Sequence, residues 1–436
     1  MHPNDPLLRS FIPVEPESHF PIQNLPFGIF STAGDSPRAG VAIGDWVVDL
    51  AALEDAGLLP AAPHGRSLYA RPVLNDFIAQ GREAATAVRT RISELLRHDN
   101  PALRDDAALR ANVLHPMEQV RLHMPVAVGN FSDFMLSREH ALNCIDIVGG
   151  TAAGQLWRNW TYLPMGYHGR ASSVVVSGTP VKRPRGQVLD EGQAAPVYRP
   201  TAKLDFELEA ALVVGRGNEI GDTVTTADAP SHMFGVVLLN DWSARDIQAW
   251  EMPGAGVFVS KSHRTSISPW IVTMDALEPF LADGPQQSPP PLPHLAQQGR
   301  RNYSVHMQAS IQPRDHARPS VVCHSNLQTM YWSFAQQVAH HTSTGCNLMP
   351  GDLLATGTVS ASGPNAQGCL YEATRDGRLS IALERGGTRQ YLEDGDEVAL
   401  TAWAQANSYR VGFGECKGRV VPADSNTNSN INGAAA

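Results

Sequence analysis

The chain has 436 residues, of which 42% are hydrophobic and 18% are charged, and its formal net charge is −9. This length and apolar content can build a substantial core in one large domain or two unequal ones, which excludes an intrinsically disordered protein. The negative balance offers no global attraction to nucleic acid or anionic membranes, and no apolar run reaches the ~18 residues of a membrane span. Since the start carries no basic and apolar leader, we expect a cytoplasmic protein that binds neither nucleic acid nor membrane.

The five cysteines are scattered along the chain without a Cys-x-x-Cys pair, at Cys144, Cys323, Cys346, Cys369 and Cys416. An odd number at this spacing predicts neither a disulfide framework nor a zinc site. We expect reduced thiols that pack as small hydrophobic side chains.

Residues 1–120 are predicted to form a small appended domain. They combine short strand-like runs, FGIFS and GVAIGDWVVDL, with one helical stretch over about residues 74–97. From about residue 121 the texture changes to many short strands with Gly and Pro between them, such as LDFELEAALVVG, FGVVLLND and RQYLEDGDEVALTAWA. Such strands favour a rolled or sandwiched β core over a doubly wound sheet.

Within residues 121–423 a helix is clearly predicted only over residues 331–341. The proline-rich segment GPQQSPPPLPH, residues 284–294, cannot lie inside a sheet because proline has no N–H to donate, so it is expected at the surface. Residues 424–436 are rich in Asn and Ser and are expected to be disordered. The segment GRGNEIG lacks the spacing of a dinucleotide loop and indicates a turn, so no organic cofactor is expected.

The run LDFELEAALVVG places Glu207 and Glu209 two residues apart in a strand-like stretch, so both carboxylates share one face. An ordinary strand with a solvent-exposed polar face is one interpretation. The other is an inward-facing pair whose mutual repulsion is relieved by a cation.

Other polar residues stand in unusual settings. Asp241 ends the apolar run FGVVLLN, either as a helix N-cap or as a carboxylate at the end of a buried strand. Asp133 and His140 lie seven positions apart, which would place them on one face if the segment were helical, although a single histidine is more often structural. Ligation by carboxylates alone favours Mg²⁺ or Ca²⁺ over zinc.

Long segments of this chain resemble the fumarylacetoacetate hydrolase family: SDF with SREHA, GYHGRASSVVVSGTPV, LDFELEAALVVG, NDWSARDIQAWE, KSHRTSISPW, GCNLMPGDLLATGTVS and YRVGFGECKGRV. They span about residues 121–422 in the family's order. The resemblance implies a mostly β (α+β) protein and a homodimer. It also implies a small N-terminal SH3-like β-barrel domain in residues 1–120 and a larger mixed β-roll catalytic domain in residues 121–423.

The resemblance implies a role for each matching position. It makes Asp133, Glu207, Glu209 and Asp241 the ligands of a divalent cation, Mg²⁺ or Ca²⁺. His140 becomes the base that activates water, Glu372 orients it, and Arg245, Gln248 and Lys261 stabilise the oxyanion. Lys261 and Thr265, with Asp241, match a second, structural cation position, and Tyr167, Gln248 and Thr358 match substrate contacts.

The implied reaction hydrolyses a carbon–carbon bond of fumarylacetoacetate, or of a close 1,3-diketo acid, to fumarate and acetoacetate or their analogues. A cation polarises the diketone carbonyl and stabilises the leaving enolate. A histidine of near-neutral pKa can take a proton from water while a carboxylate fixes its tautomer. Each donor to the oxyanion contributes roughly 3–4 kcal/mol in comparable sites.

Three substrate-binding positions depart from the family's pattern. Met135 and Met252 stand where tyrosines are expected, and Gly149 stands where an arginine is expected. The segment after Cys144 holds one extra residue, so Arg158 could supply the guanidinium instead. Neither Gly nor Met replaces a bidentate contact to a carboxylate, so we expect a less acidic or differently shaped substrate, with the ordinary substrate as the alternative. Another reaction of the wider family, such as acylpyruvate hydrolysis, oxaloacetate decarboxylation or isomerisation, and a non-catalytic homologue are the other interpretations.

Overall fold

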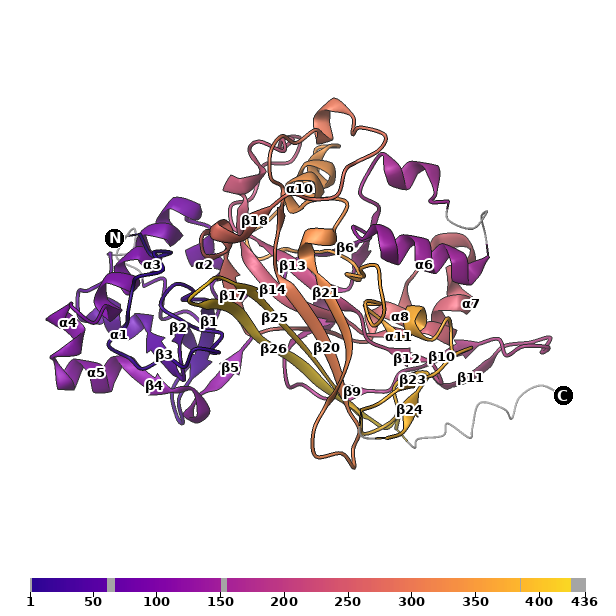
Figure 1. The fold of residues 1–436 in the computed structure, drawn as a ribbon, viewed down its shortest axis with the longest axis horizontal. Coiled ribbons are helices and arrows are strands. Elements are labelled where there is room, and N and C mark those ends of the chain that lie inside the picture. Colours follow the sequence, from indigo (N-terminus) through magenta and orange to yellow (C-terminus); the bar gives the residue numbers. More distant parts are fainter. Residues whose placement is uncertain (1, 61–66, 150–154, 385, 425–436) are drawn as a thin grey trace.

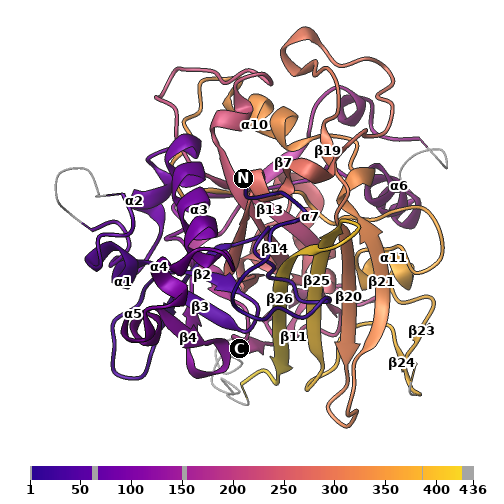
Figure 2. The same ribbon diagram turned by 60° about the vertical axis from the view of Figure 1, so that its left-hand side comes forward.

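The structure, a computed structural model, describes residues 2–60, 67–149, 155–384 and 386–424. The protein is mostly β with mixed sheets, as predicted from the sequence. Figure 1 shows the N-terminal part, in indigo and purple, beside a larger body built on long strands. In Figure 2 the strands β26, β25, β20 and β21 form one curved face of that body.

The described α-helices are α1 (Leu50–Asp55), α2 (Asn75–Ile78), α3 (Arg82–Leu96), α4 (Pro101–Arg104), α5 (Ala107–Val113), α6 (Arg138–Val148), α7 (Arg245–Ala255), α8 (Val259–Ser262), α9 (Met274–Leu277), α10 (Phe334–Thr342) and α11 (Leu370–Ala373). The strands up to the middle of the chain are β1 (Phe27–Ser31), β2 (Arg38–Ile43), β3 (Trp46–Asp49), β4 (Leu114–Pro116), β5 (Arg121–His123), β6 (Phe131–Phe134), β7 (Gly166–Gly169), β8 (Val174–Val176), β9 (Val181–Lys182), β10 (Arg185–Val188), β11 (Val197–Pro200), β12 (Leu204–Asp205) and β13 (Leu208–Val214). The later strands are β14 (Met233–Asp241), β15 (Ser243–Ala244), β16 (Thr265–Ile267), β17 (Trp270–Thr273), β18 (Leu281–Ala282), β19 (Asn302–Tyr303), β20 (His306–Gln312), β21 (Ser320–Asn326), β22 (Leu353–Ala355), β23 (Ile381–Ala382), β24 (Thr388–Arg389), β25 (Glu397–Gln405) and β26 (Arg410–Val421).

One 13-stranded sheet connects the N-terminal part to the larger body. Its main path runs β4-β3-β2-β1-β17-β14-β13-β22-β6-β7, and β1 pairs with β17 in antiparallel fashion. A five-stranded sheet, β21-β20-β25-β26-β9, lies against it. The pairings of the described strands close no ring, so the SH3-like barrel stays a prediction.

The central strands β13 and β14 are buried on both faces. Ala210 and Leu212 point into the core of the larger body, whereas Ala211 and Val213 point into the core shared with the N-terminal part. This alternation follows from the two-residue period of a strand, and it explains why both strands are apolar runs. A polar side chain on either face of these strands is therefore carried into the interior.

The N-terminal part contains more helix than the sequence predicts. The single helix predicted over residues 74–97 is instead two helices, because Gly81, with φ of 88°, interrupts it between α2 and α3. The helices α1, α4 and α5 were not predicted, since four to seven residues are too few for a hydrophobic period to show. Their N-caps Asp49, Asn100 and Asp106 were the available signal.

In the larger body, α10 confirms the helix predicted over residues 331–341, and Ser333 caps it together with Gln336. Residues 284–294 lie outside the sheets, as predicted. Their one regular element is the start of a 3₁₀ turn at Pro293–Leu295. The helices α6 and α7 were missed. Within the described ranges no helix is both long and apolar enough to cross a membrane. Of the predicted tail, residues 425–436 lie outside the described part of the chain.

Candidate active site

Four carboxylates gather where three strands of the large sheet meet. Asp133 lies on β6, Glu207 directly precedes β13, Glu209 is on β13, and Asp241 ends β14. None of the four is more than 4% exposed, and Asp133, Glu207 and Asp241 each bring one oxygen within 4.8 Å of the others. The interpretation of an exposed polar strand face is therefore wrong. Asp241 is also not a helix N-cap, since Ala244 occupies that position of α7.

The register of the sheet explains this convergence. Glu209 pairs with Leu239 across β13 and β14, and the same register continued places Glu207 opposite Asp241. Asp133 joins them from β6, which pairs with β22 beside β13. The shared helical face expected for Asp133 and His140 is wrong, because the chain leaves β6 before Ser137 caps α6.

Besides Arg245, described below, three side chains bind this carboxylate cluster. Lys261 Nζ donates to Asp241 Oδ2 at 2.9 Å and to Glu207 Oε2, and Thr265 Oγ1 donates to Asp241 Oδ1 at 2.9 Å. The Tyr167 hydroxyl lies 2.9 Å from Asp133 Oδ2 and 2.8 Å from Asp241 Oδ2. A phenol has one proton, so it cannot satisfy two ionised carboxylates at once. The cluster holds more negative charge than these partners neutralise.

Glu209 shows the imbalance most clearly. Both of its carboxylate oxygens are buried without a hydrogen-bond partner among the described residues. Burial, together with Asp133 and Glu207, raises the pKa of Glu209 well above its usual range. Burial and the charge of Asp241 raise the pKa of Asp133 to about 7. Buried carboxylates without partners are the setting in which a bound cation stabilises a site, and an all-oxygen donor set fits Mg²⁺ or Ca²⁺.

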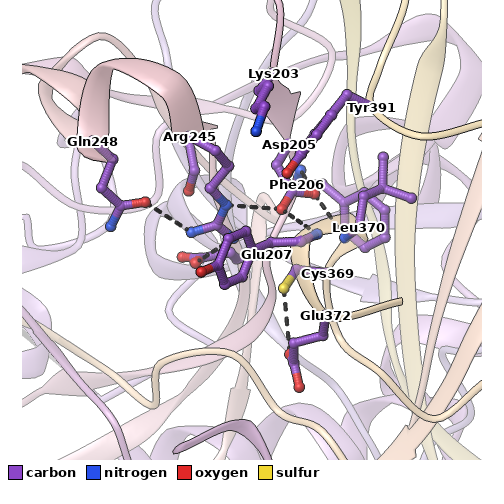
Figure 3. A network of polar contacts seen from close by, with 12 residues as sticks. Lys203, Asp205, Phe206, Glu207, Arg245, Gln248, Cys369, Leu370, Glu372 and Tyr391 are labelled. Atoms are coloured by element: carbon purple, nitrogen blue, oxygen red, sulfur yellow. Dashed lines mark hydrogen bonds and ion pairs between the residues drawn. The ribbon is translucent and has the colours of Figure 1, made fainter. Parts of the chain in front are cut away.

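Arg245 lies beside the cluster at the start of α7. Its Nε donates to Asp205 Oδ2 at 2.9 Å, and its Nη2 forms an ion pair with Glu207 Oε1 at 2.9 Å. Its Nη1 donates to Gln248 Oε1 at 3.1 Å, so the two predicted oxyanion donors are in contact (Figure 3). Burial opposes the charged guanidinium, but Glu207 and Asp205 raise the pKa of Arg245 well above its usual value.

The structure brings His140 and Glu372 together from α6 and α11. His140 Nδ1 lies 2.7 Å from Glu372 Oε1, and both residues are at most 5% exposed. Asn143 Nδ2 donates to the other carboxylate oxygen, and Ser360 Oγ donates to Oε1, each at 2.7 Å. Burial alone would raise the pKa of Glu372, but His140 and these donors hold it below its usual value. Burial lowers the pKa of His140, but Cys144 and Glu372 outweigh it and raise that pKa.

The predicted recognition residues are less closely gathered. Thr358 is buried, with its hydroxyl unpartnered among the described residues, and it follows Gly357, whose N–H donates to Asp133 Oδ1 at 3.1 Å. Met135 is half-buried against the core after β6, whereas Met252 is 51% exposed near the end of α7. Gly149 ends α6 in the left-handed region, with φ of 74°. This conformation suits glycine and disfavours an arginine at the same place.

Arg158 does not contact the carboxylates. It lines an open pocket of about 360 Å³ that Arg138 and Tyr331 also line. Arg138 lies two residues before His140, so this pocket adjoins the helix that carries the base.

Sequence reasoning missed Asp205, Asn143 and Ser360. Asp205 is fully buried; besides binding Arg245, it accepts the backbone N–H groups of Leu370 and Tyr371 at 2.8 and 2.9 Å. It therefore connects the oxyanion donor with the helix that carries Glu372 (Figure 3). The signal was present, since Asp205 continues the two-residue spacing of Glu207 and Glu209. Asn143 lies three residues after His140 and so shares its helical face, whereas nothing in the sequence marks Ser360.

Comparisons with known proteins agree with this geometry. Residues 137–421 match the model of the fumarylacetoacetate hydrolase C-terminal domain, and residues 23–125 match that of the fumarylacetoacetase N-terminal domain. The chain is 49% identical to a fumarylacetoacetase of Oryza sativa subsp. japonica over 425 residues, covering 95% of this chain and 98% of that protein. It is 44% identical to the Homo sapiens fumarylacetoacetase over 415 residues, covering 95% and 99%.

A solved structure shares the fold. The fumarylacetoacetate hydrolase of the psychrophile Exiguobacterium antarcticum matches with a TM-score of 0.51 and 18% identity, over 92% of this chain and 100% of that one. The family models together cover most of the chain, and the curated relatives match nearly all of it. The chain therefore belongs to the fumarylacetoacetate hydrolase family.

Proposed function

We propose that this protein is a hydrolase that cleaves the carbon–carbon bond of fumarylacetoacetate, or of a close 1,3-diketo acid, giving fumarate and acetoacetate or their analogues. The observation that carries the proposal is that the buried carboxylate cluster and the buried His140–Glu372 pair lie on backbone segments that are bridged to each other. Glu207 of the carboxylate cluster forms an isolated β-bridge with Cys369, three residues before Glu372, which binds the base His140. The names of the relatives support the same reaction.

The carboxylate cluster is the proposed cation site. Asp133, Glu207, Glu209 and Asp241 would hold Mg²⁺ or Ca²⁺, and the partnerless oxygens of Glu209 support this fit. A bound divalent cation would supply polarisation of the diketone oxygens and stabilisation of the enolate that leaves. We also propose a second, structural cation at the position matched by Lys261, Thr265 and Asp241, which metal analysis would reveal as two ions per chain.

The chain's own residues would carry the proton and the charge. His140, held through Nδ1 by Glu372, would take a proton from water with Nε2, and the water oxygen would bond to the diketone carbonyl carbon. When the carbon–carbon bond breaks, its electron pair passes to the leaving enolate, and His140 returns the proton to the enolate carbon. Arg245, Gln248 and Lys261 would face the developing oxyanion, and the burial of Arg245 and Lys261 strengthens their contacts.

Recognition of the substrate is proposed to involve Tyr167, Gln248 and Thr358, with Met135 and Met252 replacing polar contacts. Apolar thioethers cannot bond a terminal carboxylate, so a substrate with an uncharged or shorter acyl arm is expected to be favoured. A Met135→Tyr variant should shift preference towards fumarylacetoacetate. Ordinary turnover of that compound by the unmodified protein, with no gain in the variant, would instead support the ordinary substrate.

The proposal is tested with purified protein and a panel of 1,3-diketo acids. Loss of diketone absorbance with and without Mg²⁺ measures turnover, and chromatography identifies the two acids formed. Equal amounts of the two acids support hydrolysis, whereas release of carbon dioxide or a product of unchanged mass points to decarboxylation or isomerisation. No cation-dependent turnover of any 1,3-diketo acid would refute the proposal.

The resemblance further supports a homodimer with an SH3-like domain in residues 1–120 and a catalytic β-roll domain in residues 121–423. Light scattering tests the homodimer, with twice the chain mass expected. Limited proteolysis near residue 120 tests the division, with two resistant fragments expected.

A further inference from the structure

A second group of ligand-type side chains surrounds the base. His140, Cys369 and Glu372 are buried, and each offers a ligand atom within 4.8 Å of the other two. Cys369 Sγ lies 3.3 Å from Glu372 Oε1, on the carboxylate oxygen that also meets His140. Cys144 adds a second thiol, with its Sγ 3.6 Å from His140 Nε2 and 3.8 Å from Nδ1.

These donors differ in kind from the carboxylate cluster. Thiolate, imidazole and carboxylate together select zinc and similar thiophilic ions, whereas oxygen donors alone select Mg²⁺ or Ca²⁺. Zinc bonds of about 2.0–2.3 Å in tetrahedral geometry separate neighbouring ligand atoms by roughly 3.3–3.7 Å. The separations of 3.3 Å between Cys369 Sγ and Glu372 Oε1 and of 3.8 Å between Cys144 Sγ and His140 Nδ1 already fall near this range. The His140–Glu372 contact, at 2.7 Å, has to open, because a proton now joins those two atoms.

We propose that His140, Cys369 and Glu372, with Cys144 as the fourth donor, form an inhibitory site for Zn²⁺ or a similar thiophilic divalent cation. On binding, the two thiols release their protons to solvent, the ion takes the place of the proton between His140 Nδ1 and Glu372, and that proton passes to Nε2. No electron transfer is involved. With the ion on Nδ1, Nε2 carries the ring proton and cannot take one from water, so hydrolysis stops while the carboxylate cluster stays filled by its own cation. The inhibition rests on the proposed function, but the binding does not.

The fold explains why the sequence showed no zinc motif. Cys144 is on α6 one turn after His140, whereas Cys369 comes from the distant N-cap of α11. Figure 3 shows Cys369 between Glu207 and Glu372, so the two proposed sites lie on neighbouring backbone segments. The two sites share no ligand residue, so both ions can be held at once.

Cobalt reports thiolate ligation directly. The full-length protein, kept in saturating Mg²⁺, is titrated with Co²⁺ and followed by absorption. A thiolate-to-cobalt charge-transfer band that saturates at one ion per chain is expected. The band should be lost in Cys369→Ser, weakened in Cys144→Ala, and unchanged in Cys346→Ser, whose thiol is exposed and not among the proposed donors. Absence of the band from the unmodified protein, or equal bands in Cys369→Ser, would overturn the site.

Inhibition provides the second measurement. Zn²⁺ should abolish turnover in a manner that excess Mg²⁺ does not reverse, and Cys369→Ser should raise the half-inhibiting Zn²⁺ concentration at least about tenfold. Reversal by Mg²⁺ would place zinc on the carboxylates and contradict the proposal. If no diketo acid is hydrolysed, the proposed function fails while the cobalt band still decides the site. If Cys369→Ser does not fold, the band of the unmodified protein and its weakening in Cys144→Ala decide instead.

Discussion

Replacing Glu372 by glutamine tests the pair at the centre of the site. The carboxylate accepts at both oxygens: Oε1 from His140 and Ser360, and Oε2 from Asn143, all at 2.7 Å. A glutamine amide accepts at only one atom, so in either orientation its NH₂ group faces a donor. Hydrogen bonds to a charged group contribute about 1.5–3 kcal/mol each, and facing donors add to the loss, so about 3 kcal/mol is at stake. That energy corresponds to about 10²-fold in kcat, and the orienting carboxylate of a serine-protease triad contributes about 10⁴-fold.

We expect Glu372→Gln to lower kcat by about 10² to 10⁴-fold and to change the pH profile. His140 acts as a base only when neutral, so the rate falls as pH drops through its pKa. Burial lowers that pKa, whereas Cys144 and Glu372 raise it. Removing the carboxylate charge therefore moves the acidic limb of the profile to lower pH.

The assay is the pH dependence of kcat, with thermal unfolding to verify the fold. Glu139→Gln is the matched control, since it removes a carboxylate from the same helix without touching the base. A kcat within a factor of three of the unmodified protein, or an unmoved acidic limb at reduced kcat, would refute the assigned role of Glu372.

Three further changes probe the carboxylate cluster and its frame. At neutral pH, Mg²⁺ at 100 times its Kd should raise the free energy of unfolding by about 2.7 kcal/mol, which corresponds to a rise in Tm of about 3 °C for a chain of this length. Glu209→Gln should abolish that rise in Tm. Folding raises the pKa of Glu209, so in the absence of a cation its contribution to the free energy of unfolding is present at low pH and lost as the pH rises. Calorimetry without a cation should therefore show a smaller loss of stability with rising pH in Glu209→Gln than in the unmodified protein. Identical curves of stability against pH would contradict the buried charge. Asp205→Asn should cost about 3–5 kcal/mol in urea unfolding, because Arg245 and the N–H groups of Leu370 and Tyr371 lose a buried anion; an unchanged midpoint would refute that role. Gly357→Ala should cost about 3 kcal/mol or more, since φ is +69° and a Cβ would lie 1.8 Å from the carbonyl oxygen of Phe134; soluble expression with an unchanged Tm would contradict this crowding.

The sequence predicted the carboxylates well because they follow strand geometry. Glu207 and Glu209 share a face by the two-residue period, and Asp241 ends an apolar run that is buried as β14. It predicted the helical environment poorly. Asp133 and His140 belong to a strand and a helix separated by a short irregular segment, and the seven-residue spacing gives no sign of that break.

Contacts between segments far apart in the chain could not be predicted from local sequence patterns. His140 and Glu372, Asp205 and Leu370, and Cys369 and Glu207 are each brought together by the register of strands and loops far apart in the chain. Resemblance to the family supplied the pairing of His140 with Glu372, but it gave no role to Asp205 or the two cysteines. Burial and hydrogen bonding revealed those residues, because the sequence alone does not show which groups surround an acidic or thiol side chain in the fold.

The central claim is that a cation held by Asp133, Glu207, Glu209 and Asp241 works together with His140. The most direct measurement is a Mg²⁺ titration of chelator-treated protein, following fumarylacetoacetate cleavage and Tm in the same samples. Turnover and Tm should rise together along one binding curve, and His140→Ala should keep the rise in Tm while losing turnover. Full turnover in the chelated protein, or a His140→Ala variant that hydrolyses at the unmodified rate, would contradict the account.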